Sequence, residues 1–175
     1  MNNPLDAIAE TESHILEAIQ SVAFDVPGVV TTARGLSHFG EHALGWMALS
    51  ALGAAVDAPR RRGWVAVGAA SFASHAASVV VKRIVRRKRP DFPYVRVGVK
   101  TPSKLSFPSS HSTSTTAFLV AVAQLTGHKW VCVGIPVMMA SRMVLGVHYP
   151  SDTALGAALG AATAQVVGRY ERKTA

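Results

Sequence analysis

The sequence has a single cysteine, few charged residues and no apolar run near its N-terminus. Cys132 has no second cysteine to pair with, which excludes an internal disulfide, and a small buried apolar side chain is the simplest interpretation. The first twenty residues carry Asp6, Glu10, Glu12 and Glu17 instead of a basic stretch followed by an apolar core, so we expect no signal peptide. Charged residues make up 16% of the chain and hydrophobic residues 49%, whereas about a quarter of an ordinary soluble domain is charged. This balance favours a membrane protein.

Acidic residues are also scarce, since 10 of them stand against 18 lysines and arginines and leave a formal net charge of +8. The basic residues are concentrated at Arg60–Arg62, at Lys82–Arg89 and in the segment after Arg169. Clustered positive charge is typical of proteins that bind nucleic acid, an anionic membrane surface or an anionic substrate. Each cluster lies at the end of an apolar stretch and lacks the interleaved aromatics that nucleic-acid binding favours. We therefore expect membrane lipid and an anionic substrate as partners, and no nucleic acid.

The hydrophobic pattern predicts helices throughout. Apolar residues at helical spacing predict an amphipathic helix over residues 5–24, and a second short helix is expected over Val29–Phe39, so residues 1–40 are assigned to the membrane interface. Five apolar stretches follow, at residues 43–58, 63–81, 112–126, 129–147 and 153–168. The longest has 19 residues, while a membrane crossing needs about 20.

Because the stretches are short, a soluble helical bundle is the alternative interpretation. Three features favour the membrane. The stretches are apolar on most faces, Gly156 and Gly160 have the spacing of packed membrane helices, and Trp64 and Trp130 follow basic residues as at a membrane interface. The sequence therefore predicts an all-α integral membrane protein with about five spans. Residues 1–175 form a single domain in this interpretation, and residues 41–170 form its transmembrane bundle.

Counting the spans assigns each loop to one side of the membrane. Residues 60–62, 127–129 and 169–173 fall on one side, and the segments 82–111 and 146–152 fall on the other. The first side holds seven lysines and arginines, but residues 82–104 alone hold nine. If much of the second group binds substrate, the positive-inside rule makes the first side cytoplasmic. We therefore expect a multi-pass protein of the plasma membrane whose polar segments face the extracytoplasmic side.

Three polar clusters meet on that second side. They are Lys82–Pro90, Pro108–His111, and the group Ser141, Arg142, His148 and Asp152. A phosphate ester must be neutralised by fixed cations before a nucleophile can approach, and Lys82, Arg89 and Arg142 are the candidates. The other basic residues of the first cluster are interpreted as a solvated or headgroup-binding run; they are Arg83, Arg86, Arg87 and Lys88. His75, two helical turns before Lys82, is interpreted as a neutral histidine packed among small residues.

The second and third clusters each coincide with an expected helix start. Ser109 or Ser110 is a natural N-cap, and the free amides of a helix start favour phosphate, although a cap alone explains these residues too. Pro150 predicts a second helix start, which places Asp152 in the first turn and within reach of His148. A carboxylate on one ring nitrogen fixes the histidine tautomer and leaves the other nitrogen free to attack.

Together the clusters resemble the three-part signature of the type 2 phosphatidic acid phosphatase superfamily: Lys-x6-Arg-Pro, Pro-Ser-Gly-His and Ser-Arg-x5-His-x3-Asp. Residues 82–90, 108–111 and 141–152 carry the match, with Ser110 in place of the usual glycine. The resemblance implies metal-independent hydrolysis without a cofactor, in which His148 becomes phosphohistidine, Asp152 orients it and His111 protonates the leaving alkoxide. It also implies the residues that bind the phosphoryl oxygens, which are Lys82, Arg89, Ser109, Ser110 and Arg142.

The small size and the stretch Ala33–His42 are similar to the actinobacterial subgroup of decaprenylphosphoryl-5-phosphoribose phosphatases, which serve arabinan precursor synthesis for the cell wall. This resemblance implies a lipid-linked phosphate monoester as substrate and makes His38, Glu41 and His42 candidate headgroup contacts. Four alternatives stay open: a polyprenyl diphosphate phosphatase, a phosphatidic acid or phosphatidylglycerophosphate phosphatase, a lipid phosphotransferase, and a non-enzymatic membrane protein that binds anionic lipid. The sequence leaves the oligomeric state open.

Overall fold

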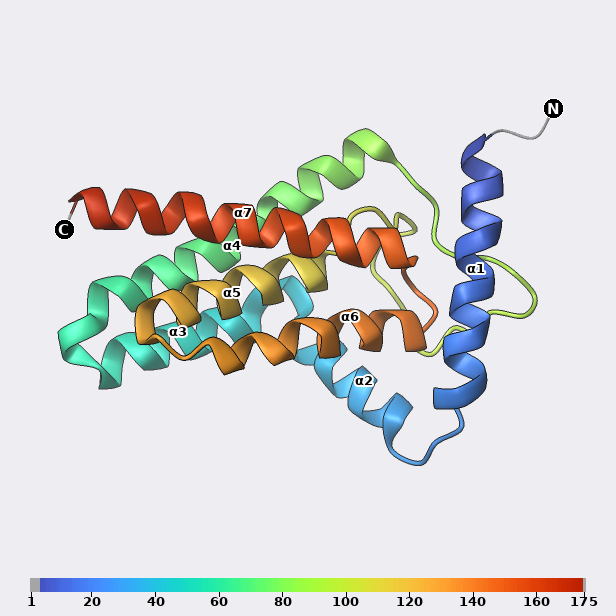
Figure 1. Cartoon of the computed structure of the whole chain (residues 1–175), viewed down its shortest axis with the longest axis horizontal. Helices are drawn as coiled ribbons and strands as arrows, with labels where there is room; N and C mark the ends of the chain where they lie inside the picture. Colours follow the sequence, from blue (N-terminus) through green and yellow to red (C-terminus); the bar gives the residue numbers. More distant parts are fainter. Residues whose placement is uncertain (1–3, 175) are drawn as a thin grey trace.

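The computed structural model describes residues 4–174, and over this range the chain is helical apart from loops and one isolated bridge between Lys88 and Leu105 (Figure 1). This confirms the predicted all-α fold. The α-helices are α1 (Pro4–Ala23), α2 (Val29–Phe39), α3 (Leu44–Val56), α4 (Arg61–Val85), α5 (Ser110–Thr126), α6 (Gly134–Val144) and α7 (Pro150–Thr174). Three short 3-10 helices connect them: η1 (Glu41–Ala43), η2 (Ala58–Arg60) and η3 (Lys129–Val133).

Helices α3 to α7 coincide with the five apolar stretches and run side by side as a bundle (Figure 1). Within the described residues, only Ala58–Val85 is long and apolar enough to cross a membrane by length and composition alone. The other helices miss that criterion for identifiable reasons. Helix α6 has 11 residues, and α5 opens with the polar run Ser110–Thr116. Residues 112–116 of this run are buried between helices, so their polarity does not face the surroundings of the bundle.

The interior of the bundle is apolar near its middle, where α3, α4, α5 and α6 share one cluster around Trp46, Val67, Phe118 and Met138. The outer faces of α3 and α4 also carry apolar side chains, and these are exposed: Leu44, Leu52, Phe72, Val80 and Ile84. Large exposed apolar surfaces are unfavourable in water and are typical of a face that contacts lipid. The distribution of apolar side chains therefore agrees with a membrane-embedded bundle.

Two glycines of α7 bring this helix against α5. A Cβ atom at Gly156 would lie 2.8 Å from the Ser109 carbonyl oxygen, and one at Gly160 would overlap the Thr113 carbonyl oxygen. The predicted packing role of the two glycines is thus confirmed. The same contact fixes the starts of both helices, because the Ser109 amide donates to the Asp152 carbonyl oxygen (3.0 Å).

Helix α1 stands across one end of the bundle, with α2 beside that end (Figure 1). The helix predicted over residues 5–24 is present, but its buried side is mixed: Leu16 and Glu12 are buried, while Ile8, Ile15 and Val22 are exposed. Buried polar residues also attach α1: the Gln20 side-chain amide donates to the carbonyl oxygens of Arg96 (2.7 Å) and Val144 (2.9 Å), and the hydroxyls of Ser13 and Tyr94 lie 2.8 Å apart. Helix α1 therefore holds the two long loops at this end of the bundle.

Candidate active site

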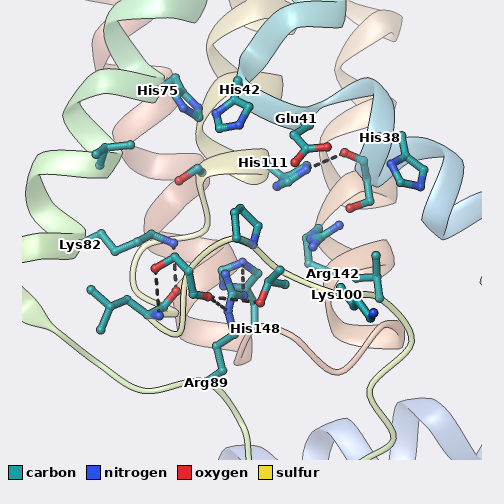
Figure 2. A pocket seen from close by; sticks show the side chains of 18 of the residues that line it. His38, Glu41, His42, His75, Lys82, Arg89, Lys100, His111, Arg142 and His148 are labelled. Atoms are coloured by element: carbon teal, nitrogen blue, oxygen red, sulfur yellow. Dashed lines mark hydrogen bonds between the residues drawn. The ribbon is translucent and has the colours of Figure 1, made fainter.

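The three polar clusters lie at the end of the bundle that α1 covers, around a cavity of about 320 Å³ (Figure 2). Helices α2, α4, α5 and α6, the 3-10 helix η1 and the loops before α5 and α7 contribute to the wall. The residues predicted from the sequence that line the cavity are His38, Glu41, His42, Lys82, Arg89, Ser110, His111, Arg142 and His148. Two further predicted residues, Ser109 and Asp152, are fully buried behind this wall.

The segment between α4 and α5 folds back on itself and thereby places Arg89. The Ser106 amide donates to the Arg87 carbonyl oxygen (2.8 Å), and the Arg89 amide donates to the Lys104 carbonyl oxygen (3.3 Å). The Arg89 guanidinium then donates to two backbone oxygens, those of Ser103 (2.8 Å) and Val147 (2.6 Å). The side chain is therefore held from both sides at the cavity floor.

Three cations of the cavity have no carboxylate partner within residues 7–174, whose side chains the structure describes. The Lys82 ammonium donates only to the Leu105 carbonyl oxygen (3.2 Å). Arg142 is 1% exposed, and its Nε and Nη1 atoms have no hydrogen-bond partner. Burial lowers the pKa of Arg89 to about 10, an effect that the Asp152 charge partly opposes, so Arg89 stays protonated at neutral pH. Unpaired buried cations are costly, and an anion in the cavity would relieve that cost.

His148 follows α6 in a short loop that Gly146 allows to turn with a φ of +65°. The His148 Nε2 atom lies 3.1 Å from Arg89 Nη1. A guanidinium can only donate, so Nε2 accepts and the proton of the neutral ring sits on Nδ1. Burial and the neighbouring cations Arg89, Arg142 and Lys82 lower the pKa of His148 well below its ordinary value. The ring is therefore neutral at physiological pH, and its lone pair is on Nε2.

Asp152 lies in the first turn of α7, which begins at Pro150 as the sequence predicted. Its Oδ2 atom is 3.6 Å from His148 Nδ1 and accepts a hydrogen bond from the Tyr149 amide (2.8 Å). At 3.6 Å the neutral ring and the carboxylate are too far apart for a hydrogen bond, and catalytic contacts of this kind often tighten when substrate binds. Asp152 faces the nitrogen that carries the proton, which is the orientation needed to stabilise an imidazolium.

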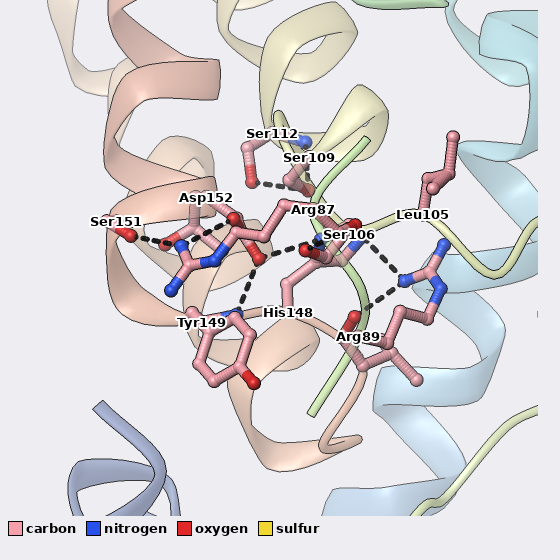
Figure 3. A network of polar contacts seen from close by, with 12 residues as sticks. Arg87, Arg89, Leu105, Ser106, Ser109, Ser112, His148, Tyr149, Ser151 and Asp152 are labelled. Carbon is pink, nitrogen blue, oxygen red and sulfur yellow. Dashed lines mark hydrogen bonds and ion pairs between the residues drawn. The ribbon is translucent and has the colours of Figure 1, made fainter. Parts of the chain in front are cut away.

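The first cluster contains one inward residue that the sequence interpretation missed. Arg87 was expected in a solvated run, but its guanidinium donates to Asp152 Oδ1 (3.0 Å) and to the Ser151 hydroxyl (2.7 Å) (Figure 3). The other three basic residues of that run, Arg83, Arg86 and Lys88, are exposed. The reason is local: α4 ends at Val85 and Arg86 adopts a left-handed conformation with φ 55°, which redirects the chain and turns the next side chain inward. A run of charges in a sequence does not reveal such a reversal.

The second cluster combines a cap with a cavity residue. Ser109 is the N-cap of α5, as predicted for one of the two serines, and its hydroxyl accepts from the Ser112 amide (3.3 Å). Ser109 is buried and does not line the cavity, so its assignment to phosphate binding stays a prediction. Ser110 does line the cavity, and its hydroxyl accepts from the Ser78 hydroxyl of α4 (2.8 Å).

His111 is oriented by α2. Its Nε2 atom lies 2.9 Å from the Ser37 carbonyl oxygen, and a carbonyl can only accept, so this nitrogen carries a proton. Gly40, just after α2, packs against the same edge of the ring: a Cβ atom there would lie 2.8 Å from His111 Cδ2 and 3.6 Å from its Nε2. No feature of the sequence indicated that a backbone oxygen and a glycine of this region hold His111.

The mouth of the cavity is formed by η1, α4 and the segment before α5. His42 adopts a left-handed conformation with φ 52°, and its ring lies edge-to-face with that of His75 at 5.9 Å (Figure 2). His75 thus lines the cavity with its Nδ1 atom unpartnered, instead of packing among small residues as expected. Lys100 also lines the mouth, and the sequence had not indicated it.

Within the described part of the chain, no three histidine, cysteine or acidic side chains stand close enough together to hold a metal ion. The cavity instead presents lysine, arginine and histidine side chains, a helix start and one carboxylate, that of Glu41, while the ion-paired Asp152 lies behind the wall. This donor set suits an anion with several oxygens, such as phosphate.

Comparison with known proteins gives concordant findings. A family model described as the PAP2 superfamily matches residues 63–174. A protein of Mycobacterium tuberculosis named decaprenylphosphoryl-5-phosphoribose phosphatase is 52% identical over 156 residues, which cover 89% of this chain and 88% of that protein. A protein of the same name from Mycolicibacterium smegmatis is 54% identical over 145 residues, covering 83% of this chain and 81% of its own length. The crystal structure of a transmembrane PAP2 type phosphatidylglycerolphosphate phosphatase from Bacillus subtilis is similar in fold. Its TM-score is 0.71 at 24% identity, over 92% of this chain and 86% of that one.

Proposed function

The chain belongs to the PAP2 superfamily and is a membrane lipid phosphatase, and from this premise we propose that it dephosphorylates decaprenylphosphoryl-5-phosphoribose through a phosphohistidine at His148. The observation that carries the proposal is the set of three cations without a carboxylate partner, the buried Lys82 and Arg142 and the half-buried Arg89, around the neutral Nε2 of that histidine. The identity of this chain to relatives named for that substrate supports the choice of lipid.

In the first step the phosphate displaces the contact between Arg89 and His148 and binds the three cations and the start of α5. Nε2 of His148 attacks phosphorus, a P–N bond forms, and the P–O bond to the leaving group breaks. Bound phosphate favours the imidazolium form of His111, which gives its second ring proton to the leaving alkoxide and becomes neutral, and Asp152 stabilises the positive charge that develops on the ring of His148. The fixed cations supply most of the rate because they are already oriented toward the charge of the transition state.

In the second step water attacks the phosphohistidine. His111, now neutral, takes a proton from this water, and the P–N bond breaks. Inorganic phosphate leaves and Nε2 of His148 regains its lone pair. No step needs a further group beyond the side chains that surround the cavity.

Displacing His111 without removing it is expected to slow this chemistry. In Gly40→Ala the new methyl group lies 2.8 Å from His111 Cδ2, so the ring must move, and a shift of about 1 Å can cost up to roughly 100-fold in rate. We expect kcat to fall about 10- to 100-fold. The backbone of Gly40, at φ −82°, suits alanine, so strain is not the cause. Gly35→Ala in α2 is the matched control because nothing lies within 4 Å of its Cβ. Equal kcat for the two variants would contradict the arrangement of α2 around His111.

We assign the headgroup to the cavity mouth and the lipid tail to the outer face of the bundle. His38, Glu41 and His42 lie where the ribose hydroxyls would extend from a phosphate held by the three cations, and Lys100 lies where it would neutralise the phosphodiester. The tail would leave between η1 and α4 and follow the exposed apolar side chains of α3 and α4. The lipid would then enter from the side, without leaving the membrane.

We place the protein in the plasma membrane as a multi-pass protein with its active site on the extracytoplasmic face. The opposite end of the bundle carries Arg60–Arg62, Lys129 and the basic C-terminal residues. The end of the bundle near the site also carries basic residues, which would favour the opposite orientation. Three of them, Lys82, Arg87 and Arg89, point inward and contact other residues of the protein, so they count less toward the positive-inside rule. Intact cells are expected to hydrolyse an added impermeant substrate; hydrolysis only after lysis would place the site inside.

A substrate panel tests the proposed function. Purified protein without added metal is offered prenylphosphoryl-5-phosphoribose, prenyl mono- and diphosphates, phosphatidic acid and phosphatidylglycerophosphate, and phosphate release is measured. We expect the highest kcat/KM on the phosphoribose lipid. Preference for a diphosphate or a glycerolipid would overturn the substrate assignment, and transfer of phosphate to an added alcohol would indicate a phosphotransferase. Binding of anionic lipid without release from any substrate would reject the enzyme.

A further inference from the structure

Helix α1 takes part in a charged network that ends at the catalytic pair. Glu12 of α1 is paired with the Arg87 guanidinium (2.5 Å), and Arg87 is paired with Asp152 (3.0 Å), which faces His148. The side chain of Glu12 is 11% exposed, that of Arg87 21% and that of Asp152 0%. The contacts are therefore largely shielded from water. Shielded ion pairs attract more strongly than ion pairs at an exposed surface.

Arg87 contacts Asp152 on the oxygen that His148 does not use. Oδ1 of Asp152 accepts from Arg87, while Oδ2 accepts from the Tyr149 amide and faces Nδ1 of His148 (Figure 3). The guanidinium also lies over the Tyr149 ring at 4.0 Å, which fixes its plane. Without Arg87 the carboxylate would lose its only cationic partner among the described residues, and the Tyr149 amide and the Ser106 hydroxyl alone would hold its orientation toward His148.

Glu12 holds Arg87 and the start of α7 together. Its Oε1 atom accepts from the Ser151 amide (2.7 Å), one of the free amides at the start of that helix, and its Oε2 atom accepts from the Ser151 hydroxyl (3.0 Å). Burial raises the pKa of Glu12, but the hydrogen bonds from Arg87 and Ser151 and the charge of Arg87 outweigh it, so the net pKa is lowered. Glu12 is thus ionised at neutral pH and caps α7 from another helix.

We propose that Arg87 and Glu12 are positioning residues for catalysis, which hold Asp152 in the orientation that keeps the proton on Nδ1 of His148. Neither is the catalytic group itself, since neither lines the cavity that would hold the phosphate. The proposal rests on the phosphohistidine mechanism above. It gives α1 a part in the active site beyond that of an interfacial helix.

Arg87→Met tests the proposal, with Lys88→Met as the matched control because Lys88 is its exposed neighbour and loses the same charge. We expect kcat of Arg87→Met to fall about 10- to 100-fold with KM for the lipid substrate nearly unchanged. Arg87→Lys keeps the charge but not the planar fork and should recover part of the loss. Glu12→Gln should cost less than Arg87→Met, and adding it to Arg87→Met should cost little more, because its effect passes through Arg87.

The pH profile separates positioning from a purely structural role. The charged or titratable groups that face His148 are Lys82 of α4, Arg89 of the loop, His111 of α5, Arg142 of α6 and Asp152 of α7. Removing Arg87 leaves the negative charge of Asp152 without its cationic partner. This charge then stabilises the protonated ring of His148 and raises the pKa of that histidine. The acid limb of kcat/KM should therefore move to higher pH in Arg87→Met.

Two results would overturn the proposal. One is a lower melting temperature of Arg87→Met with unchanged kcat per active protein molecule, where active molecules are those that His148 phosphorylation counts. That result would indicate a structural role only. The other is loss of kcat without any shift of the acid limb. If Arg87→Met does not fold, Arg87→Lys and Glu12→Gln carry the same comparison. Failure of the phosphohistidine mechanism is distinct, because it would appear as turnover by a variant that lacks His148.

Discussion

Alanine in place of His148 is expected to abolish phosphate release, with a loss of kcat of about four orders of magnitude or more. The reason is that Nε2 of His148, beside the three cations, is the nucleophile of the proposed mechanism. Substrate affinity should change little, since Lys82, Arg89 and Arg142 remain in place to bind the phosphate. Steady-state phosphate release on the prenylphosphoryl-5-phosphoribose lipid measures the effect.

The matched control is His128→Ala, an exposed histidine between α5 and α6, which should keep full activity. Because His148 is buried, His148→Gln is measured as well, and helical content and melting temperature are recorded for both variants. Turnover within tenfold of the unmodified protein in a folded His148 variant would remove the proposed mechanism.

The second large effect is expected for His111→Ala, at about 100- to 10,000-fold on a substrate with an alkoxide leaving group. His111 lines the cavity and is held by the Ser37 carbonyl oxygen, so it is placed to protonate the departing oxygen. An aryl phosphate or a prenyl diphosphate has a leaving group that needs less protonation. Its kcat/KM should therefore fall much less in the same variant.

The comparison between leaving groups is the measurement that decides the role of His111. Equal losses on alkyl and aryl phosphates would indicate that His111 binds the phosphate and does not act as the acid. Gly40→Ala supplies an intermediate case, because it moves the ring and leaves its chemistry intact.

Local signals in the sequence predicted much of the secondary structure. Helix α2 spans Val29–Phe39 as expected, Ser109 caps α5, and α7 begins at Pro150. Each of these features depends on a residue and its immediate neighbours: a proline that starts a helix, a serine that caps one, or apolar residues at helical spacing. Such information is fully contained in a short stretch of sequence.

The number of membrane-spanning helices was harder to predict from hydropathy than the secondary structure was. Helix α5 lies inside the bundle with buried serines and threonines, so its composition is less apolar than its position. Hydropathy reports how well a segment suits lipid on all sides. A helix that is enclosed by other helices does not need to meet that condition.

Contacts between distant segments could not be predicted. Glu12 and Ser151 are 139 positions apart, and Arg87 and Asp152 are 65 apart, so nothing local marks them as partners. The Ser37 oxygen that orients His111 is a backbone atom, which carries no residue-type signal at all. His75 was assigned to packing because only its own helix could be predicted around it. The sequence of α4 does not show that η1, from an earlier part of the chain, completes a cavity beside His75.

The most direct test of the account is to trap the covalent intermediate. The protein is mixed with a substrate that carries radioactive phosphorus, quenched in alkali within one turnover and digested, and the labelled peptide is sequenced. We predict an acid-labile, alkali-stable phosphoryl group on the peptide that contains His148, attached at Nε2. Label on a serine, or rapid phosphate release with no labelled protein at any time, would contradict the account.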